Sequence, residues 1–224
     1  MEPELAGSPF FCSWSGGKDS ALAFHRAVRH GGVPGVMVTM MTETGLRSRS
    51  HGLRREVLAR QAAAIGVPIR FVATTWDDYE NKFCAEVRSV VAGGIGRGVF
   101  GDIDTESHRE WELSVCARAG ATAHLPLWQT ERPTLMRELL DNGFQAAVVA
   151  VRDGLLPPEI LGKVIDAEML GLFTDAGVDI AGENGEYHTV VTDGPIFRTP
   201  LRLTFGETIL RDGVWFIDAE ADAG

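Results

Sequence analysis

The residues best suited to chemistry lie near the start of the chain, in the run Ser-Gly-Gly-Lys-Asp-Ser at residues 15–20, here called the glycine loop. Its two glycines, Gly16 and Gly17, allow the backbone to turn and to approach a ligand closely. Successive backbone N–H groups and the start of a helix attract anions, and Lys18 adds a full positive charge. A loop of this composition between an apolar run and a helical segment predicts a phosphate-binding site.

The glycine loop differs from the common G-x-x-x-x-G-K-[ST] phosphate loop, because the first glycine is missing and Asp19 follows the lysine. Helix capping by its serines and its aspartate is the simpler interpretation of such a turn. Capping does not require two glycines and a lysine flanked by Ser15 and Ser20, whose hydroxyl groups can bond phosphate oxygens. We therefore expect this loop to bind phosphate.

A second group of reactive side chains lies in the run GENGEYHT at residues 182–189. Glu183, Glu186 and His188 are of the types that bind magnesium, orient a carboxylate or take up a proton. The Asn-Gly pair in the middle of the run is also the signal of a type I′ β-hairpin, whose flanking acids would only be solvated. The local sequence alone favours the hairpin.

Three other positions have both a functional and an ordinary interpretation. Asp102 follows an apolar run and could hold magnesium or orient a substrate, or it could cap the next helix. Arg109 lies in a helical segment, where a solvated ion pair is the usual role of an arginine. His51, in a Ser-His-Gly run, lies in a loop that could close over a nucleotide or could simply be mobile.

Regularly alternating elements separate these positions. Runs rich in Val, Ile and Phe alternate with segments of helical periodicity as far as the run QAAVVAV at residues 145–151. This alternation predicts parallel strands joined by right-handed crossovers, and hence an α/β fold with a doubly wound, mainly parallel sheet. Beyond it, short strand-like runs joined by turns predict a smaller C-terminal α+β region. We place the boundary between a domain at 1–127 and a domain at 128–224.

The composition limits the kinds of partner. The chain has 224 residues and a formal net charge of −10, which opposes a polyanion, so we expect no nucleic-acid partner. Its three cysteines form no C-x-x-C pair, and the first ten residues lack the basic start and apolar run of a secretory signal. No apolar run is long enough for a membrane span. We therefore expect a cytoplasmic protein, and the sequence leaves open whether it is a monomer or a homodimer.

The glycine loop resembles the PP-loop of the N-type ATP pyrophosphatase superfamily. The resemblance implies a HUP-type, adenine nucleotide alpha hydrolase-like fold, with ATP and Mg²⁺ as cofactors. In that superfamily the loop holds the β- and γ-phosphates while ATP adenylates a substrate oxygen and pyrophosphate leaves. The resemblance implies contacts to ATP from Ser15, Gly16, Gly17, Lys18, Asp19 and Ser20.

Two later blocks are similar to those of the diphthine–ammonia ligase family within that superfamily. The matching pieces are Gly101-Asp102-Ile103, Arg109, Val115-Cys116, Leu127-Trp128, residues 183–189 and residues 193–197. The resemblance extends over most of the chain and implies an ATP-dependent carbon–nitrogen ligase. Such an enzyme adenylates a carboxylate and transfers it to ammonia, releasing AMP and pyrophosphate. The acceptor carboxylate would belong to a small molecule or to a modified protein side chain.

The resemblance also implies roles for single residues and leaves alternatives open. It makes Lys18, Glu183, Glu186 and His188 catalytic, and Asp102, Arg109, Asn184, Gly185 and Tyr187 substrate-binding, while the metal ligands stay unassigned. Asn184 stands where the family has glycine, and His188 stands where it has an acid. The alternatives are therefore a ligase of this type with a different acceptor, or a module that senses ATP or AMP without chemistry.

Overall fold

The chain folds into two compact units that interleave in the sequence. The structure is a computed structural model that describes residues 5–222; residues 1–4, part of the N-terminal stretch considered above, lie outside the described residues. The first unit contains the residues up to Ser15, Asp19–Ser50 and Gly66–Thr130. The second contains Gly16–Lys18, His51–Ile65 and the chain from Glu131 onward. The predicted boundary between residues 127 and 128 stays a prediction.

The first unit is built on a parallel sheet of five strands in the order β3-β2-β1-β4-β5. The strands are β1 (Pro9–Ser13), β2 (Val33–Met41), β3 (Ile69–Ala73), β4 (Arg97–Val99) and β5 (Thr122–His124). The helices that connect them within this unit are α1 (Lys18–Arg29), α3 (Tyr79–Ala92) and α4 (Glu106–Ala119). This strand order is that of a doubly wound α/β fold, and the predicted fold class is confirmed.

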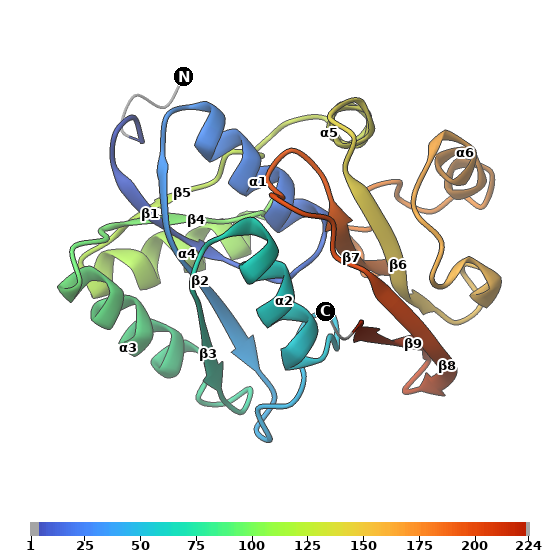
Figure 1. Ribbon diagram of the computed structural model, residues 1–224, viewed down its shortest axis with the longest axis horizontal. Coiled ribbons are helices and arrows are strands. Elements are labelled where there is room, and N and C mark those ends of the chain that lie inside the picture. The colour runs from blue at the N-terminus through green and yellow to red at the C-terminus, as the bar shows by residue number, and fades with distance from the viewer. Residues whose placement is uncertain (1–4, 223–224) are drawn as a thin grey trace. The chain divides into compact units, whose positions relative to one another are not determined.

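The two faces of this sheet are covered by different helices. Phe11 points into a buried cluster with residues of α3 and α4, and these two helices lie side by side in Figure 1. The neighbouring Phe10 points to the opposite face, where its ring lies 5.4 Å from that of Phe24 on α1. Successive side chains of a strand point to opposite faces of a sheet. Because helices cover both faces here, nearly every residue of a central strand must be apolar.

The second unit is built on an antiparallel sheet of four strands in the order β7-β6-β9-β8. The strands are β6 (Gln145–Arg152), β7 (Tyr187–Asp193), β8 (Leu203–Arg211) and β9 (Val214–Ala221). Its helices are α2 (Arg55–Ile65), α5 (Arg132–Asp141), the short 3-10 helix η1 (Pro158–Ile160) and α6 (Ala167–Asp175). The predicted α+β region is confirmed, but the prediction that residues 145–151 continue the parallel alternation is wrong. β6 pairs antiparallel with both of its neighbours, because burial of a strand on both faces does not depend on its direction.

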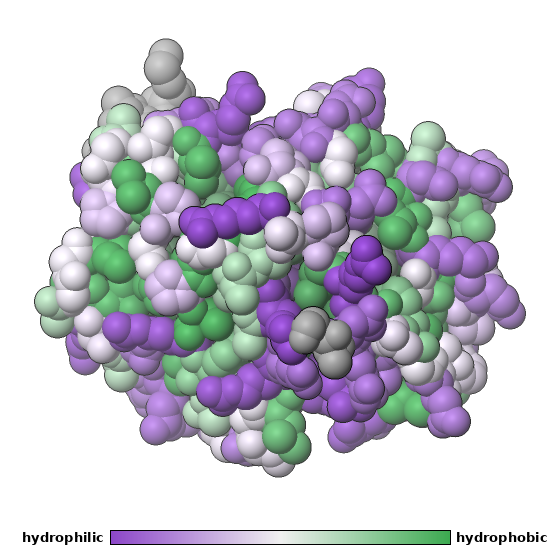
Figure 2. Space-filling model, viewed as in Figure 1, coloured by the Kyte–Doolittle hydropathy of each residue, from purple (hydrophilic) through white to green (hydrophobic). Residues whose placement is uncertain are grey.

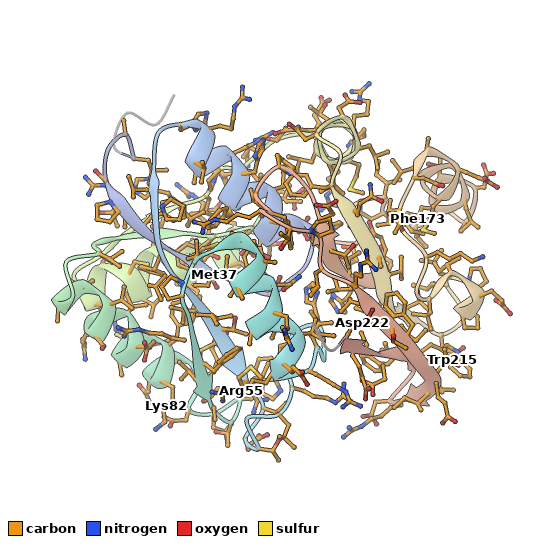
Figure 3. All side chains as sticks on the ribbon, viewed as in Figure 1. Met37, Arg55, Lys82, Phe173, Trp215 and Asp222 are labelled. Carbon is orange, nitrogen blue, oxygen red and sulfur yellow. The ribbon has the colours of Figure 1, made fainter. Side chains whose placement is uncertain are left out.

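Local signals explain two features of the second unit. Asp212 and Gly213 join β8 to β9, and both have positive φ, as the tight turns of β-hairpins require. Trp215 lies just after this turn (Figure 3) and donates from Nε1 to Asp153, at 2.9 Å. Phe173 on α6, also labelled in Figure 3, stacks on the ring of Tyr187 with 4.7 Å between ring centroids. This stacking fixes the start of β7 against α6.

The exposed surface is mixed in character. On the face seen in Figure 2, apolar residues are interspersed with polar ones. Within residues 5–222, no helix has both the length and the apolar character needed to cross a membrane.

Candidate functional site

The first half of the glycine loop is held by α2 and β7 of the second unit. The carbonyl oxygen of Gly16 accepts hydrogen bonds from the backbone N–H of Val191 and from Nε2 of Gln61, both at 2.9 Å. The fully buried Gln61 also donates to the carbonyl of Val191, at 2.7 Å. Gly16 has a φ of +85°, and a Cβ built there would lie 2.7 Å from Cδ2 of Leu58. Backbone conformation and close packing therefore both require glycine at this position.

Lys18 begins α1 and is held by β7. Its backbone N–H donates to Oγ1 of Thr189 at 3.0 Å, so this group is used by the protein and is not left for a phosphate. The Lys18 side chain is only 5% exposed, and its Nζ lies 5.3 Å from the centroid of the Tyr187 ring. The ring face attracts the ammonium group, and the loop thus carries a largely buried positive charge.

His51 lies directly over the second glycine of the loop. A Cβ built on Gly17 would lie 2.2 Å from Cε1 of His51, a distance at which the two atoms could not coexist. Nδ1 of His51 is 2.8 Å from the carbonyl oxygen of Thr189, and since a carbonyl only accepts, Nδ1 is the donor. The ring of His188 lies 4.7 Å from that of His51 between centroids. The structure thus brings His188, a predicted catalytic residue, next to a histidine that faces the loop.

The second half of the glycine loop packs against the end of β4 in the first unit. The hydroxyl oxygens of Ser15 and Ser20 lie 3.1 Å apart and share a hydrogen bond. A Cβ built on Gly101 would lie 2.9 Å from backbone atoms of Asp19 and of Ser20, so only glycine allows this approach. Asp102, a predicted substrate-binding residue, directly follows Gly101 and is therefore positioned close to the start of α1.

Asp102, whose side chain is partly exposed, pairs with a buried carboxyl group. Its Oδ1 lies 2.8 Å from Nδ1 of His108, and it also hydrogen-bonds the side chain of Glu112 on α4. Glu112 is 3% exposed, and its Oε2 has no hydrogen-bond partner among the described residues. Burial, followed by the hydrogen bond and the charge of Asp102, raises the pKa of Glu112 to about 11. Glu112 is therefore a neutral carboxylic acid at pH 7.

Arg109 shows the ordinary contacts of a helical arginine. Its Nη1 is 2.7 Å from Oε1 of Glu106, one turn earlier on α4, and both side chains are well exposed. The guanidinium carbon also lies 5.3 Å from the centroid of the Trp128 ring. These contacts, which are all within the protein, hold the Arg109 side chain in place. Its predicted role in substrate binding stays a prediction.

Within the segment at residues 182–189, residues 182–186 form a turn around the carboxylate of Glu186, and β7 begins at Tyr187. Oε2 accepts from the backbone N–H of Asn184 at 3.0 Å, while Oε1 accepts from the Asn184 side chain at 3.0 Å and from the N–H of Asp179 at 3.3 Å. Burial acts to raise the pKa of Glu186, but these hydrogen bonds outweigh it and hold the pKa below its ordinary value. Glu186 is thus ionised and structural in this turn, and its predicted catalytic role stays a prediction.

A second carboxylate, that of Asp179, completes the turn. Its Oδ2 accepts from Nη1 of Arg132 at 2.8 Å and from the backbone N–H of Glu183 at 2.9 Å. The hydroxyl of Tyr187 donates to the carbonyl of Ile180 at 2.6 Å. The backbone of Glu183, a predicted catalytic residue, is therefore held by the Asp179 carboxylate, and the side chain of Tyr187, a predicted substrate-binding residue, by the Ile180 carbonyl.

The hairpin interpretation of the Asn-Gly pair is wrong. Gly185 has a φ of +74°, but Asn184 has no positive φ, whereas a type I′ turn needs positive φ at both positions. The chain reaches this turn from α6, and β7, which begins at Tyr187, pairs with β6. The carboxylates of Glu186 and Asp179, which accept from backbone N–H groups two to seven positions away, decide the conformation in place of the dipeptide.

Three residues at these sites have no role in the sequence-based prediction. Thr189 and Gln61 fasten the glycine loop to β7 and α2, and Glu112 pairs with Asp102. Thr189 lies inside the block at 182–189, but its partner is Lys18, which the sequence separates from it by 171 positions. The only available signal for Glu112 and Gln61 is a polar residue on the buried face of a helix.

A 3-2-1-4-5 parallel sheet with a glycine loop after its first strand defines an α/β protein of the Rossmann-like HUP type. Within this class the chain belongs to the diphthamide synthase family. The model of the diphthamide synthase N-terminal domain matches residues 10–123, which include the glycine loop. The model of the C-terminal domain matches residues 131–220, which include the turn around Glu186.

Named relatives agree with this family. The chain is 32% identical over 101 residues to the diphthine–ammonia ligase of Homo sapiens, a stretch that covers 43% of this chain and 38% of the human protein. It is 34% identical over 102 residues to that of Danio rerio, covering 43% of this chain and 40% of the relative. The matched stretch thus spans about two fifths of these relatives.

Structural comparison gives a more distant likeness. A solved structure from Methanocaldococcus jannaschii, described as a "predicted subunit of tRNA methyltransferase", matches with a TM-score of 0.44 and 16% sequence identity. The match covers 84% of this chain and 98% of that chain.

Proposed function

We propose that this protein is an ATP-dependent amide ligase of the diphthine–ammonia ligase type. It adenylates a carboxylate, releasing pyrophosphate, and transfers the acyl group to ammonia, releasing AMP. The observation that carries this proposal is the buried ammonium group of Lys18 in the glycine loop. The loop is bonded to Thr189 of β7, which lies in the range matched by the family's C-terminal domain. A positive charge fixed at this point would stabilise the charge that grows on the departing pyrophosphate.

The remaining residues support the proposal in different ways. The Ser15 and Ser20 hydroxyls would bond phosphate oxygens, and Asp102 would orient the acceptor. Among residues 5–222 there is no group of three or more His, Cys, Asp or Glu side chains that could hold a metal ion. No residue is therefore assigned to Mg²⁺, which would be carried by the phosphates of ATP, and the steps proposed here do not depend on its position.

One observation favours a second function, that of a nucleotide sensor without chemistry. The carboxylate of Glu186 is used by its own turn, and Glu112 is protonated, so neither is a ready base for attacking ammonia. A sensor would bind ATP and leave it intact. The relatives are named for diphthine as acceptor, and a different carboxylate is the third alternative.

The experiment that tests the proposal follows the fate of ATP. We expect incubation with ATP, Mg²⁺, ammonium and diphthine to give AMP and pyrophosphate. Lys18→Ala should slow this reaction on the order of a hundredfold or more, because it removes a charge next to the leaving group. Lys82→Ala is the matched control, since Lys82 is an exposed lysine on α3 (Figure 3). ADP and phosphate as products, or a Lys18→Ala variant with full activity, would refute the proposed ligase.

The nitrogen donor gives an independent test. If ammonia is the nucleophile, the rate at a fixed total concentration of ammonium should rise with pH as more of it is deprotonated. Glutamine should not replace it, because no glutaminase activity is proposed for this chain. Equal rates with glutamine in a purified assay would contradict the proposed use of free ammonia.

A further inference from the structure

His51 is fixed against the glycine loop by contacts on two sides. Its ring occupies the space in which a Cβ of Gly17 would lie, with Cε1 at 2.2 Å and Nδ1 at 2.8 Å from that position. Its Nδ1–H donates to the carbonyl oxygen of Thr189, at 2.8 Å. Thr189 in turn accepts the backbone N–H of Lys18, so the imidazole, the loop and β7 form one hydrogen-bonded assembly.

The hydrogen bond to Thr189 determines what the other ring nitrogen can do. With the proton on Nδ1, Nε2 of the neutral ring carries a lone pair and can only accept. Nε2 is bonded to Cε1, the ring atom nearest to the built Cβ, and lies at least 3.2 Å from that Cβ. Uptake of a second proton would turn Nε2 into a charged donor.

Without a ligand the ring is neutral at pH 7. Burial and the charge of Lys18 lower the pKa of His51 to about 4, against the opposing effect of the Thr189 carbonyl. Lys18 is the charged group that acts on the ring from α1, and His188 on β7 is the titratable neighbour, whose ring is tilted by 35° to that of His51. Several negative charges placed on the loop would offset the lysine and favour the imidazolium form.

We propose that His51 is a catalytic residue on the phosphate side of the site, an inference that rests on the proposed function. His51 takes up a proton when ATP binds. It then donates a hydrogen bond from Nε2 to the terminal phosphates. The proton comes from hydronium or from the buffer acid, which leaves water or the buffer base behind, and it adds to the lone pair of Nε2. The imidazolium then stabilises the pyrophosphate as the α–β phosphate bond breaks, together with Lys18. This role also explains why position 17 is glycine: a side chain there would displace the ring from the loop.

Two substitutions separate this role from a merely structural one. His51→Asn places an amide N–H near the position of Nδ1, which can keep the bond to Thr189, but it has no group at the position of Nε2. His51→Gln reaches the position of Nε2 with a donor that needs no proton. His30→Asn, at an exposed histidine that follows α1, is the matched control.

The test is calorimetric titration with Mg-ATP at pH 7 in two buffers of different ionisation enthalpy, which counts the protons taken up on binding. We expect wild type and His30→Asn to take up more protons than His51→Asn, by up to one per site. We expect His51→Asn to bind ATP about tenfold more weakly, the loss of one charge-assisted hydrogen bond. We expect His51→Gln to bind more tightly than His51→Asn but, like it, to lose the proton uptake. In wild type, the NMR resonance of Nε2 of His51 should move to its protonated position when ATP is added, which keeps the proposal testable if a variant fails to fold.

Three results would overturn the inference. Equal proton uptake and affinity in wild type and His51→Asn would make His51 a structural lock only. Tighter binding by His51→Asn would show that the ring occupies the place of a phosphate. Both results leave the proposed ligase intact if Lys18→Ala weakens binding, whereas failure of wild type to bind ATP would remove the proposed function and this inference together.

Discussion

Replacement of Glu112 by glutamine should stabilise the protein relative to wild type, and this difference in the free energy of unfolding should grow as the pH rises. Glu112 is 3% exposed and keeps its proton to about pH 11, mainly because burial disfavours its charged form. Glutamine has nearly the same shape, and its amide N–H can replace the carboxylic O–H as a donor to Asp102. The substitution therefore removes an ionisation and leaves the packing of α4 almost unchanged.

The magnitude follows from the proton that each state holds. The unfolded chain releases the Glu112 proton near the ordinary glutamate pKa of about 4.3, whereas the native chain retains it to about pH 11. The native state binds more protons over this interval, so the free energy of unfolding falls as the pH rises, by up to about 1.4 kcal/mol per pH unit. Between pH 6 and pH 9 the variant should therefore gain up to about 4 kcal/mol relative to wild type.

Urea unfolding at several pH values measures this difference directly. The slope of unfolding free energy against pH should be more negative for wild type than for Glu112→Gln. Glu110→Gln is the control, because Glu110 lies on the same helix but is exposed, and it should keep the slope of wild type. Parallel slopes for wild type and Glu112→Gln would refute the assignment of a buried neutral acid.

Three further substitutions test the packing of the second unit. Gly17→Ala should lower the free energy of unfolding by about 1–3 kcal/mol through overlap with His51, as measured by thermal unfolding. Adding His51→Ala should recover most of this loss, and no recovery would show that the clash lies elsewhere. Glu186→Gln should cost about 1–3 kcal/mol in urea unfolding, because a donor would replace an acceptor among three N–H groups; an unchanged midpoint would contradict the network around Glu186. Asp166→Ala should lose about 1 kcal/mol, since Asp166 caps α6 through the N–H of Met169, while Asp166→Asn should lose less; equal losses would argue against capping.

Local chemistry explains how much of the fold the sequence predicts. The strands and helices of the parallel sheet follow from apolar periodicity, and the β8–β9 turn follows from an Asp-Gly pair that tolerates positive φ. The same reasoning fails at Asn184-Gly185. There the backbone N–H groups bond to the carboxylates of Glu186 and Asp179, and this network is stronger than a dipeptide preference.

The sequence by itself determined the chemical character of the glycine loop, because glycines, a lysine and serines adjacent to one another suit a phosphate whatever surrounds them. It also determined the alternation of strands and helices in the first unit, because that pattern is a property of contiguous residues, whereas the direction of β6 was decided by its partners in the folded sheet. Only the tertiary structure decided which groups act on that loop. Thr189 and His51 reach it from segments distant in sequence, and the neutrality of Glu112 arises from burial against Asp102. Burial and long-range hydrogen bonding set protonation and orientation, and neither is a property of a residue and its neighbours in the chain.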